Sequence, residues 1–380
     1  MNALPHHRPH AIDALVALAS ISALATGQTG AFPDVDALTE DRSFVEQLSA
    51  AGPLAAGSYT TSLSSPDAPQ SDLPVWEENR SDRYPPMGYK NTRMVRPEQI
   101  IFDYQLEYRR FKGMRDSRDT VSSSDIFDGG ATFAPTEMTW ITHDLQMLYG
   151  IRDDWTVSVS LPVIDKDMDI DLAAGGSKSL TSSGLGDLRL GATTIVKADD
   201  YMKMMSHFAI SFPTGNIDET DSDTPLPYPM QLGTGTLDIF PGITQMWQGE
   251  DTSWGFNTEA RLHVGRNQDN YGVSDTYFLG GWWTRSFTPT IAGSLRLEGT
   301  WWGDYHGRSD TLDPTVSPVN DKFAQGGTRI DLFGGGEWDL GDYDRDQRLG
   351  LEVGVPIDEW LDGPQLATHM IARLAWRISF

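Results

Sequence analysis

The sequence predicts an all-β fold, a closed antiparallel transmembrane β-barrel of about twelve strands with short periplasmic turns and long extracellular loops. Three observations predict it. Apolar and polar residues alternate at period two in many segments, short connections alternate with long ones, and tryptophans lie near segment ends. Beyond the extreme N-terminus, no stretch reaches the roughly eighteen consecutive apolar residues of a membrane-spanning helix.

The composition excludes several classes of function. The chain has 380 residues, no cysteine and a formal net charge of −25. Without cysteine there is no disulfide, no thiolate metal site and no cysteine nucleophile. Phosphate binding needs clustered Lys and Arg, so a strongly acidic chain is a poor partner for nucleic acid. We therefore expect no nucleic-acid partner and no cofactor.

Residues 1–31 are predicted to form an export signal peptide. Arg8 and three histidines precede a mainly apolar stretch, Ala11–Ala25. Ala23–Ala25 and Thr29–Ala31 both offer small residues for cleavage. A short buried or disordered helix is the alternative interpretation of this stretch.

Residues 32–97 are predicted to form an irregular periplasmic N-terminal extension. They are rich in Pro, Ser, Ala and Asp, and Ser64–Asp72 has the composition of a linker. Two alternatives are open for residues 32–85: they tuck into the mouth of the barrel and plug it, or they remain disordered.

The barrel is predicted over residues 98–380, where period-two alternation dominates. It is clearest in 102–109, 155–163, 254–264, 291–298 and 349–355. Each segment is near the ten residues that a tilted membrane strand needs. The last eleven residues alternate as well and end at Phe380, which resembles the closing strand of a bacterial outer-membrane barrel. We expect the barrel-assembly machinery to recognise this C-terminal strand.

The lengths of the connections favour a barrel over a soluble β-sandwich. Short connections lie near 150–154, 198–200, 249–252, 287–290 and 340–346. Longer polar ones lie near 112–136, 165–184, 214–234, 266–273, 304–326 and 357–365. Short and long alternate throughout, as they do when both termini of a barrel lie in the periplasm. A sandwich alternates along its strands but has no reason to sort its connections by length.

Tryptophans are expected to form two girdles at the membrane interfaces. Trp155, Trp247, Trp254 and Trp338 lie next to short connections, and Trp301–Trp302 lie near a long one. Amphipathic rings at both ends of the strands suit the two lipid–water boundaries. Core packing in a soluble protein would not collect them at strand ends.

Charged side chains on the faces opposite the apolar stripes are predicted to line the lumen. An Arg or Lys on the lipid face costs about 2–4 kcal/mol at mid-bilayer. The candidates are Glu107, Arg109, Asp187, Arg189, Glu259, Arg261, Arg296, Glu298, Arg329, Asp331, Glu352, Arg373 and Arg377. Two compatible interpretations are open: a structural ladder of ion pairs that fills a narrow barrel, or a selective lining for a polar or aromatic solute.

Three further clusters contain groups that could bind a metal ion or act in catalysis, but none is predicted to be a site. Alternating aspartates over 165–171 and acids over 218–223 could bind Ca²⁺ or Mg²⁺, but the calcium-loop spacing is absent. Met202, Met204, Met205 and His207 suit Cu(I), although Met near a short turn usually faces lipid. His143 lies between Thr142 and Asp144, but no nucleophile motif accompanies it. No catalytic and no metal-binding residue is predicted.

Four motifs carry a family resemblance. In order they are Ser183–Leu188 (SGLGDL), Ser211–Gly215 (SFPTG), Leu226–Thr236 (LPYPMQLGTGT) and Leu361–Gln365 (LDGPQ). Together they resemble the phenol-degradation (meta-pathway) outer-membrane transporter family over roughly residues 85–380. The resemblance implies an outer-membrane barrel with a role in transport and no established catalytic residue.

The expected function is that of an outer-membrane channel or transporter for small, hydrophobic or aromatic solutes, surrounded by outer-membrane lipid. A structural or adhesive barrel without transport is one alternative. An outer-membrane lipid-modifying enzyme is the other, although we expect no enzymatic activity. Two gates are hypothesised: the N-terminal segment before the first strand, and the long, Pro-containing loop 214–234.

Overall fold

A computed structural model describes residues 80–90, 92–341 and 347–380. The predicted signal peptide and residues 32–79 of the predicted extension lie outside these described ranges. No helix among the described residues is long and apolar enough to span a membrane.

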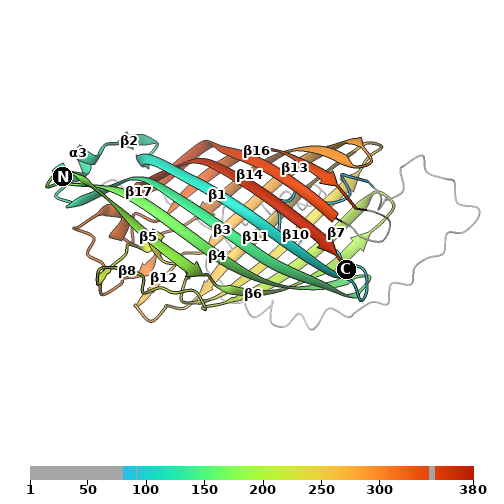
Figure 1. Cartoon of the computed structure of the whole chain (residues 1–380), viewed down its shortest axis with the longest axis horizontal. Helices are drawn as coiled ribbons and strands as arrows, with labels where there is room; N and C mark the ends of the chain where they lie inside the picture. The colour runs from blue at the N-terminus through green and yellow to red at the C-terminus, as the bar shows by residue number, and fades with distance from the viewer. Residues whose placement is uncertain (1–79, 91, 342–346) are drawn as a thin grey trace, which may run out of the picture. The chain divides into compact units, whose positions relative to one another are not determined.

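The described residues form a closed sheet in which each strand pairs antiparallel with its neighbours (Figure 1). Strand β17 returns to pair with β1 and closes the ring. In chain order the ring strands are β1 (Ile100–Ser117), β3 (Phe133–Arg152), β4 (Trp155–Leu172), β6 (Leu188–Ala198), β7 (Met202–Phe212), β10 (Leu237–Gln248), β11 (Thr252–Val264), β13 (Thr276–Thr288), β14 (Ile291–Trp302), β16 (Gly327–Asp339) and β17 (Gln347–Ser379). The predicted fold class, a closed antiparallel barrel, is confirmed.

Strand β17 runs along the barrel twice, once in each direction. Its first half pairs with β16 and its second half pairs with β1, and Leu361 has a partner on both strands. The chain therefore reverses just after Leu361, where Gly363 has a φ of +78°. A closed ring in which every pair of neighbours is antiparallel needs an even number of strands. Eleven labelled strands form the ring, but β17 contributes two of them, so the barrel has twelve.

Turns at one end of the barrel are short, and connections at the other end are mostly long. The short turns follow β3, β6, β10, β13 and β16, as predicted. The opposite end carries β2 (Asp119–Val121), α3 (Ser123–Asp128), β5 (Ser177–Leu185), β8 (Thr220–Asp221), β9 (Thr224–Pro225), η2 (Tyr228–Met230), β12 (Tyr271–Gly272), β15 (His306–Gly307) and η3 (Pro318–Asn320). Helix α3 has a capping box between Ser122 and Asp125.

The prediction of a loop over 165–184 was wrong, because β4 and β5 extend through most of it. Four aspartates from Asp165 to Asp171 face outward, while Lys166, Met168 and Ile170 face inward and are buried. Inward and outward side chains still alternate here, but the outward ones change from apolar to acidic. This change is expected where a strand leaves the bilayer. Residues 112–117, also predicted as loop, are likewise strand. The predicted connection at 357–365 is present, but it is confined to the reversal just after Leu361, with strand on both sides.

Strands β5 and β6 together occupy one strand position of the ring, next to β4. Strand β5 pairs with the outer half of β4 and β6 pairs with its inner half. The break between them falls at Gly186 and Asp187, and Thr214 closes it by accepting from Leu188 N at 2.8 Å and donating to Gly186 O at 3.0 Å.

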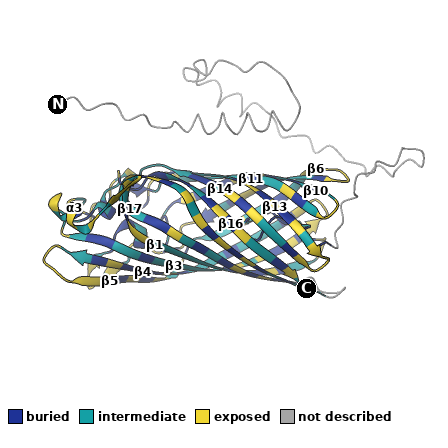
Figure 2. Cartoon of the chain, turned by 90° about the horizontal axis from the view of Figure 1, so that it is seen from above, coloured by how far each residue is buried: buried dark blue, intermediate teal, exposed yellow. Residues whose placement is uncertain are grey.

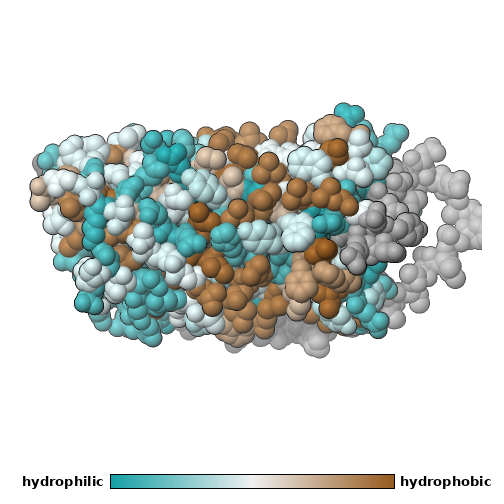
Figure 3. Space-filling model, in the orientation of Figure 1, coloured by the Kyte–Doolittle hydropathy of each residue, from teal (hydrophilic) through white to brown (hydrophobic). Residues whose placement is uncertain are grey.

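The outward face of the barrel carries an apolar belt. Burial alternates residue by residue along the strands (Figure 2). Hydrophobic residues gather over the half nearer the short turns, and the end that carries α3 and β8 is hydrophilic (Figure 3). Exposed Trp155, Trp254 and Trp338 mark the short-turn edge of the belt. Trp302 departs from the predicted girdle, because its side chain lines the lumen.

Candidate channel lumen

The described residues just before the first strand lie inside the barrel at the end with the short turns. Residues 80–90 and 92–97 cross the lumen there as an irregular segment, the inner segment. Ser253 Oγ donates to the Asp82 carbonyl at 2.7 Å, and Arg348 Nη2 donates to the Arg80 carbonyl at 3.0 Å. Buried wall side chains thus satisfy the backbone of this segment and fix its path.

Further inward, the inner segment presents side chains to the middle of the lumen. Gln105 Nε2 donates to the Met87 carbonyl at 3.0 Å. The ring of Tyr89 packs against Trp282 with centroids 5.2 Å apart. Lys90 forms an ion pair with Asp144, a wall residue on β3.

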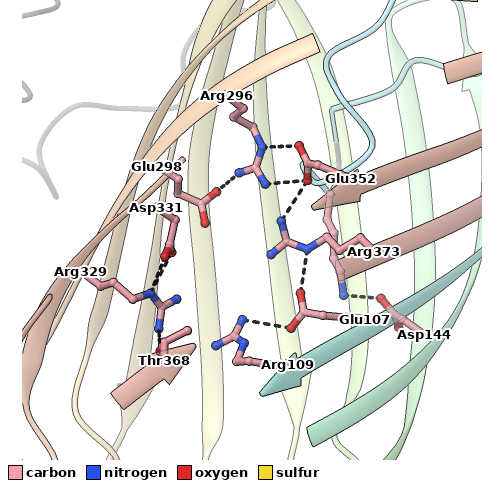
Figure 4. A network of polar contacts seen from close by, with 11 residues as sticks. Glu107, Arg109, Asp144, Arg296, Glu298, Arg329, Asp331, Glu352, Thr368 and Arg373 are labelled. Atoms are coloured by element: carbon pink, nitrogen blue, oxygen red, sulfur yellow. Dashed lines mark hydrogen bonds and ion pairs between the residues drawn. The ribbon is translucent and has the colours of Figure 1, made fainter. Parts of the chain in front are cut away.

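A network of ion pairs crosses the lumen at the level of this segment (Figure 4). Arg296 donates to both oxygens of Glu352, at 2.8 and 2.7 Å, and also pairs with Glu298. Arg373 bridges Glu352, at 3.2 Å, and Glu107, at 2.8 Å. Bidentate guanidinium–carboxylate contacts of this kind are charge-assisted and directional, so they hold several strands in one arrangement.

Arg109 extends the network, and Arg329, Asp331 and Thr368 form a separate group beside it (Figure 4). Arg109 Nη2 donates to Glu107 at 3.0 Å. Arg329 Nε donates to Asp331 at 2.8 Å, and its Nη1 donates to Thr368 Oγ1 at 2.9 Å.

On the opposite wall, three strands bring a second group of charges together. Arg261 Nη2 donates to Asp238 at 2.7 Å, and His207 Nε2 lies 3.2 Å from Glu259. Their neighbour Arg189 stacks its guanidinium 3.7 Å from the ring centroid of Phe240.

A cavity of about 620 Å³ lies between the inner segment and the long loops. Nine of the predicted lining residues border it: Glu107, Arg109, Asp187, Arg189, Glu259, Arg261, Glu298, Arg329 and Arg373. Arg296, Asp331 and Glu352 are buried in the ion-pair network, and Arg377 pairs with Asp103. Asp187 accepts hydrogen bonds from Gly215 N at 2.9 Å and Thr234 N at 3.0 Å, so its carboxylate anchors the loop between β7 and β10.

Three tyrosines from three different loops form an aromatic roof over the cavity. Tyr228 packs edge-on against Tyr271 and Tyr305, with centroids 4.8 and 5.2 Å apart. Burial raises the pKa of Tyr305 to about 12. Lys166 Nζ donates to the Pro229 and Gln231 carbonyls and so fixes the loop between β7 and β10, the roof loop, against β4. Sequence reasoning missed these residues, because contacts between loops leave no periodic signal.

The structure separates two of the minor clusters. His143 faces outward with its Nδ1 2.8 Å from Tyr104 Oη, whereas Asp144 faces inward to Lys90, so the two cannot act together. In the methionine cluster, Met205 and His207 point inward, while Met202 and Met204 lie on the opposite face of β7. Among the described residues, no group of three His, Cys, Asp or Glu side chains is placed to hold a metal ion.

Comparisons with known proteins agree with this architecture. A sequence model of the family described as "Putative MetA-pathway of phenol degradation" matches residues 115–351. An outer membrane channel from Pseudomonas putida F1 is similar in structure, with a TM-score of 0.54 and 13% identity over 75% of this chain and 97% of that chain. The NanC porin superposes more loosely, with a TM-score of 0.39 and 11% identity over 73% of this chain and 98% of its own. No curated protein was found to match the sequence.

The first of these structures shows that the fold is that of an outer-membrane barrel. The family match covers more than half of the chain and confirms the family resemblance drawn from the four motifs.

Proposed function

The chain belongs to the phenol-degradation (MetA-pathway) family, and on this premise we propose that it is an outer-membrane channel for small solutes with apolar or aromatic bodies. One observation carries the proposal. The barrel lumen holds a cavity of about 620 Å³, within the size range of small-molecule sites, rather than being filled by side chains.

The cavity offers a solute two kinds of surface. Charged side chains from the walls line it together with apolar and aromatic ones, including Trp140, Trp302 and Phe278. A purely structural ladder would leave no such space, although the network around Arg296 and Glu352 does favour a structural role for that level of the barrel. Both interpretations of the charged lining therefore apply, at different heights in the lumen.

Both hypothesised gates border the cavity. Residues 88–90 of the inner segment lie at one end, and residues 228–234 of the roof loop lie at the other. Passage requires each to move. Side-chain hydrogen bonds and ion pairs to the wall hold both segments, so these contacts can rearrange to open a path while the strand pairing of the sheet stays intact.

The outer surface fits the remaining proposed partners. Its apolar belt suits outer-membrane lipid, and β17, which closes the ring against β1, is the strand proposed for recognition by the barrel-assembly machinery.

The test is single-channel recording of the refolded chain in a planar bilayer, together with uptake of benzyl alcohol into proteoliposomes. We expect small conductance steps and uptake above that of protein-free vesicles. A chain that folds to a heat-modifiable barrel but gives neither conductance nor uptake would refute the channel and leave the structural or adhesive barrel.

A further inference from the structure

Arg189 is the exception among the charged residues of the lumen. The predicted lining set contains seven arginines, and six of them have a carboxylate within hydrogen-bonding distance. In the described part of the chain, the Arg189 side chain has no hydrogen bond and no ion pair; its close contact is the ring of Phe240.

The sheet register explains why Arg189 has no partner. Its neighbours on β4 and β7 are Ser160 and Ser211, so no carboxylate lies directly across either strand pair. Three carboxylates, Glu259, Asp144 and Asp238, act on the Arg189 charge from beyond ion-pair distance. Asp144 and Asp238 already have cationic partners, Lys90 and Arg261 respectively. Glu259 lies 3.2 Å from His207 Nε2, a contact that is an ion pair only when His207 is protonated.

The geometry leaves the hydrogen-bonding edge of Arg189 free. Phe240 covers one face of the guanidinium at 3.7 Å, and the ring itself is only 2% exposed. Stacking fixes the plane of the group, while its N–H donors point sideways, in the fork arrangement that matches a carboxylate. Arg189 borders the cavity, so this edge is accessible to a solute there.

Apolar surface lies next to this cation. Arg261, the other arginine near Phe240, lies 5.4 Å from its ring centroid and lines the same cavity as Tyr305 of the aromatic roof. Val273 packs against Tyr228 and Tyr271, and Leu232 also lines the cavity. A solute that filled the site would present one anionic group to Arg189 and an apolar body to the roof.

We propose that Arg189 and Phe240 form a carboxylate-binding site, and that the solute class of this channel is small monocarboxylates with an aromatic or apolar body. The inference rests on the proposed channel function, because it names the solutes of the same cavity. It also predicts something that a channel for neutral hydrocarbons would not show, namely discrimination by charge.

The test is calorimetric titration of the purified full chain in detergent with sodium benzoate, and with benzyl alcohol as the neutral counterpart. We expect benzoate to bind at least about tenfold more tightly than benzyl alcohol. Arg189→Gln should weaken benzoate binding by about tenfold or more and leave benzyl alcohol binding unchanged, whereas Arg189→Lys should recover part of the loss. Arg285→Gln, at an exposed ion pair with Asp251 outside the lumen, is the matched control.

Equal binding of benzoate and benzyl alcohol by the unsubstituted chain would overturn the inference, whether or not the variants fold. Unchanged benzoate binding by Arg189→Gln would overturn it as well. Phe240→Leu, which keeps the charge and removes the stacked ring, should also weaken benzoate binding. Because binding is measured in detergent, absence of conductance in a bilayer would refute the proposed channel function without deciding this binding result.

Discussion

Glu352 is the most connected carboxylate of the lumen, and replacing it with Gln should destabilise the barrel substantially. It accepts three hydrogen bonds from Arg296 and Arg373, and it is 4% exposed. Removing one partner of a buried ion pair costs about 3–5 kcal/mol. Arg296 keeps Glu298 and Arg373 keeps Glu107, so we expect the lower end, a loss of about 3 kcal/mol in the free energy of unfolding.

The assay is reversible urea unfolding of the chain in lipid vesicles, followed by tryptophan fluorescence. Asp251→Asn is the control, because its ion pair with Arg285 is about half exposed and should contribute at most about 1 kcal/mol. If Glu352→Gln lost no more stability than Asp251→Asn, the network would not hold the strands as argued.

Three further predictions concern the two gates. A Cβ on Gly88 would lie 2.6 Å from Arg296 Nη2, so Gly88→Val should displace the inner segment and raise single-channel conductance; unchanged conductance would mean that this segment does not limit passage. Deletion of residues 32–97 should raise conductance several-fold, and a truncated barrel that conducts like the full chain would exclude the segment as a gate. Lys166→Met removes the cation that binds two carbonyls of the roof loop, so it should lengthen channel openings, whereas Lys112→Met at an exposed site should not; equal opening times would show that Lys166 does not hold the gate.

The alternation of side chains predicted the barrel because it follows directly from strand geometry in a bilayer. At the outer end of β4 the alternation continues beyond the apolar stretch, so the strand is longer than predicted. There Val163 gives way to Asp165 on the outward face, while Met168 continues the buried inward face. The switch from valine to aspartate marks the edge of the membrane and does not mark the end of the strand.

The inner segment could not be predicted in the same way. Its contacts depend on single residues meeting gaps in the wall: a Cβ on Gly350 would lie 2.7 Å from Met87 Cγ, and one on Gly280 would lie 3.0 Å from the ring of Tyr89. Alternation predicts that Gly280 and Gly350 face the lumen. It does not predict that these glycines leave the space in which the inner segment packs.

The charged lining shows where periodicity stops being informative. Alternation places Arg189 and Arg373 on the same inward face, and by that criterion they are equivalent. Register separates them: Arg373 lies directly opposite Glu107, whereas Arg189 lies opposite Ser160 and Ser211. A paired arginine has satisfied its charge within the wall, and breaking that pair is a loss of stability. An arginine without a carboxylate, stacked on Phe240 and open to a cavity, contributes little to holding the strands together, so its substitution should change what binds more than whether the barrel folds. The stability and the solute preference of this barrel should therefore respond to different arginines on the same face.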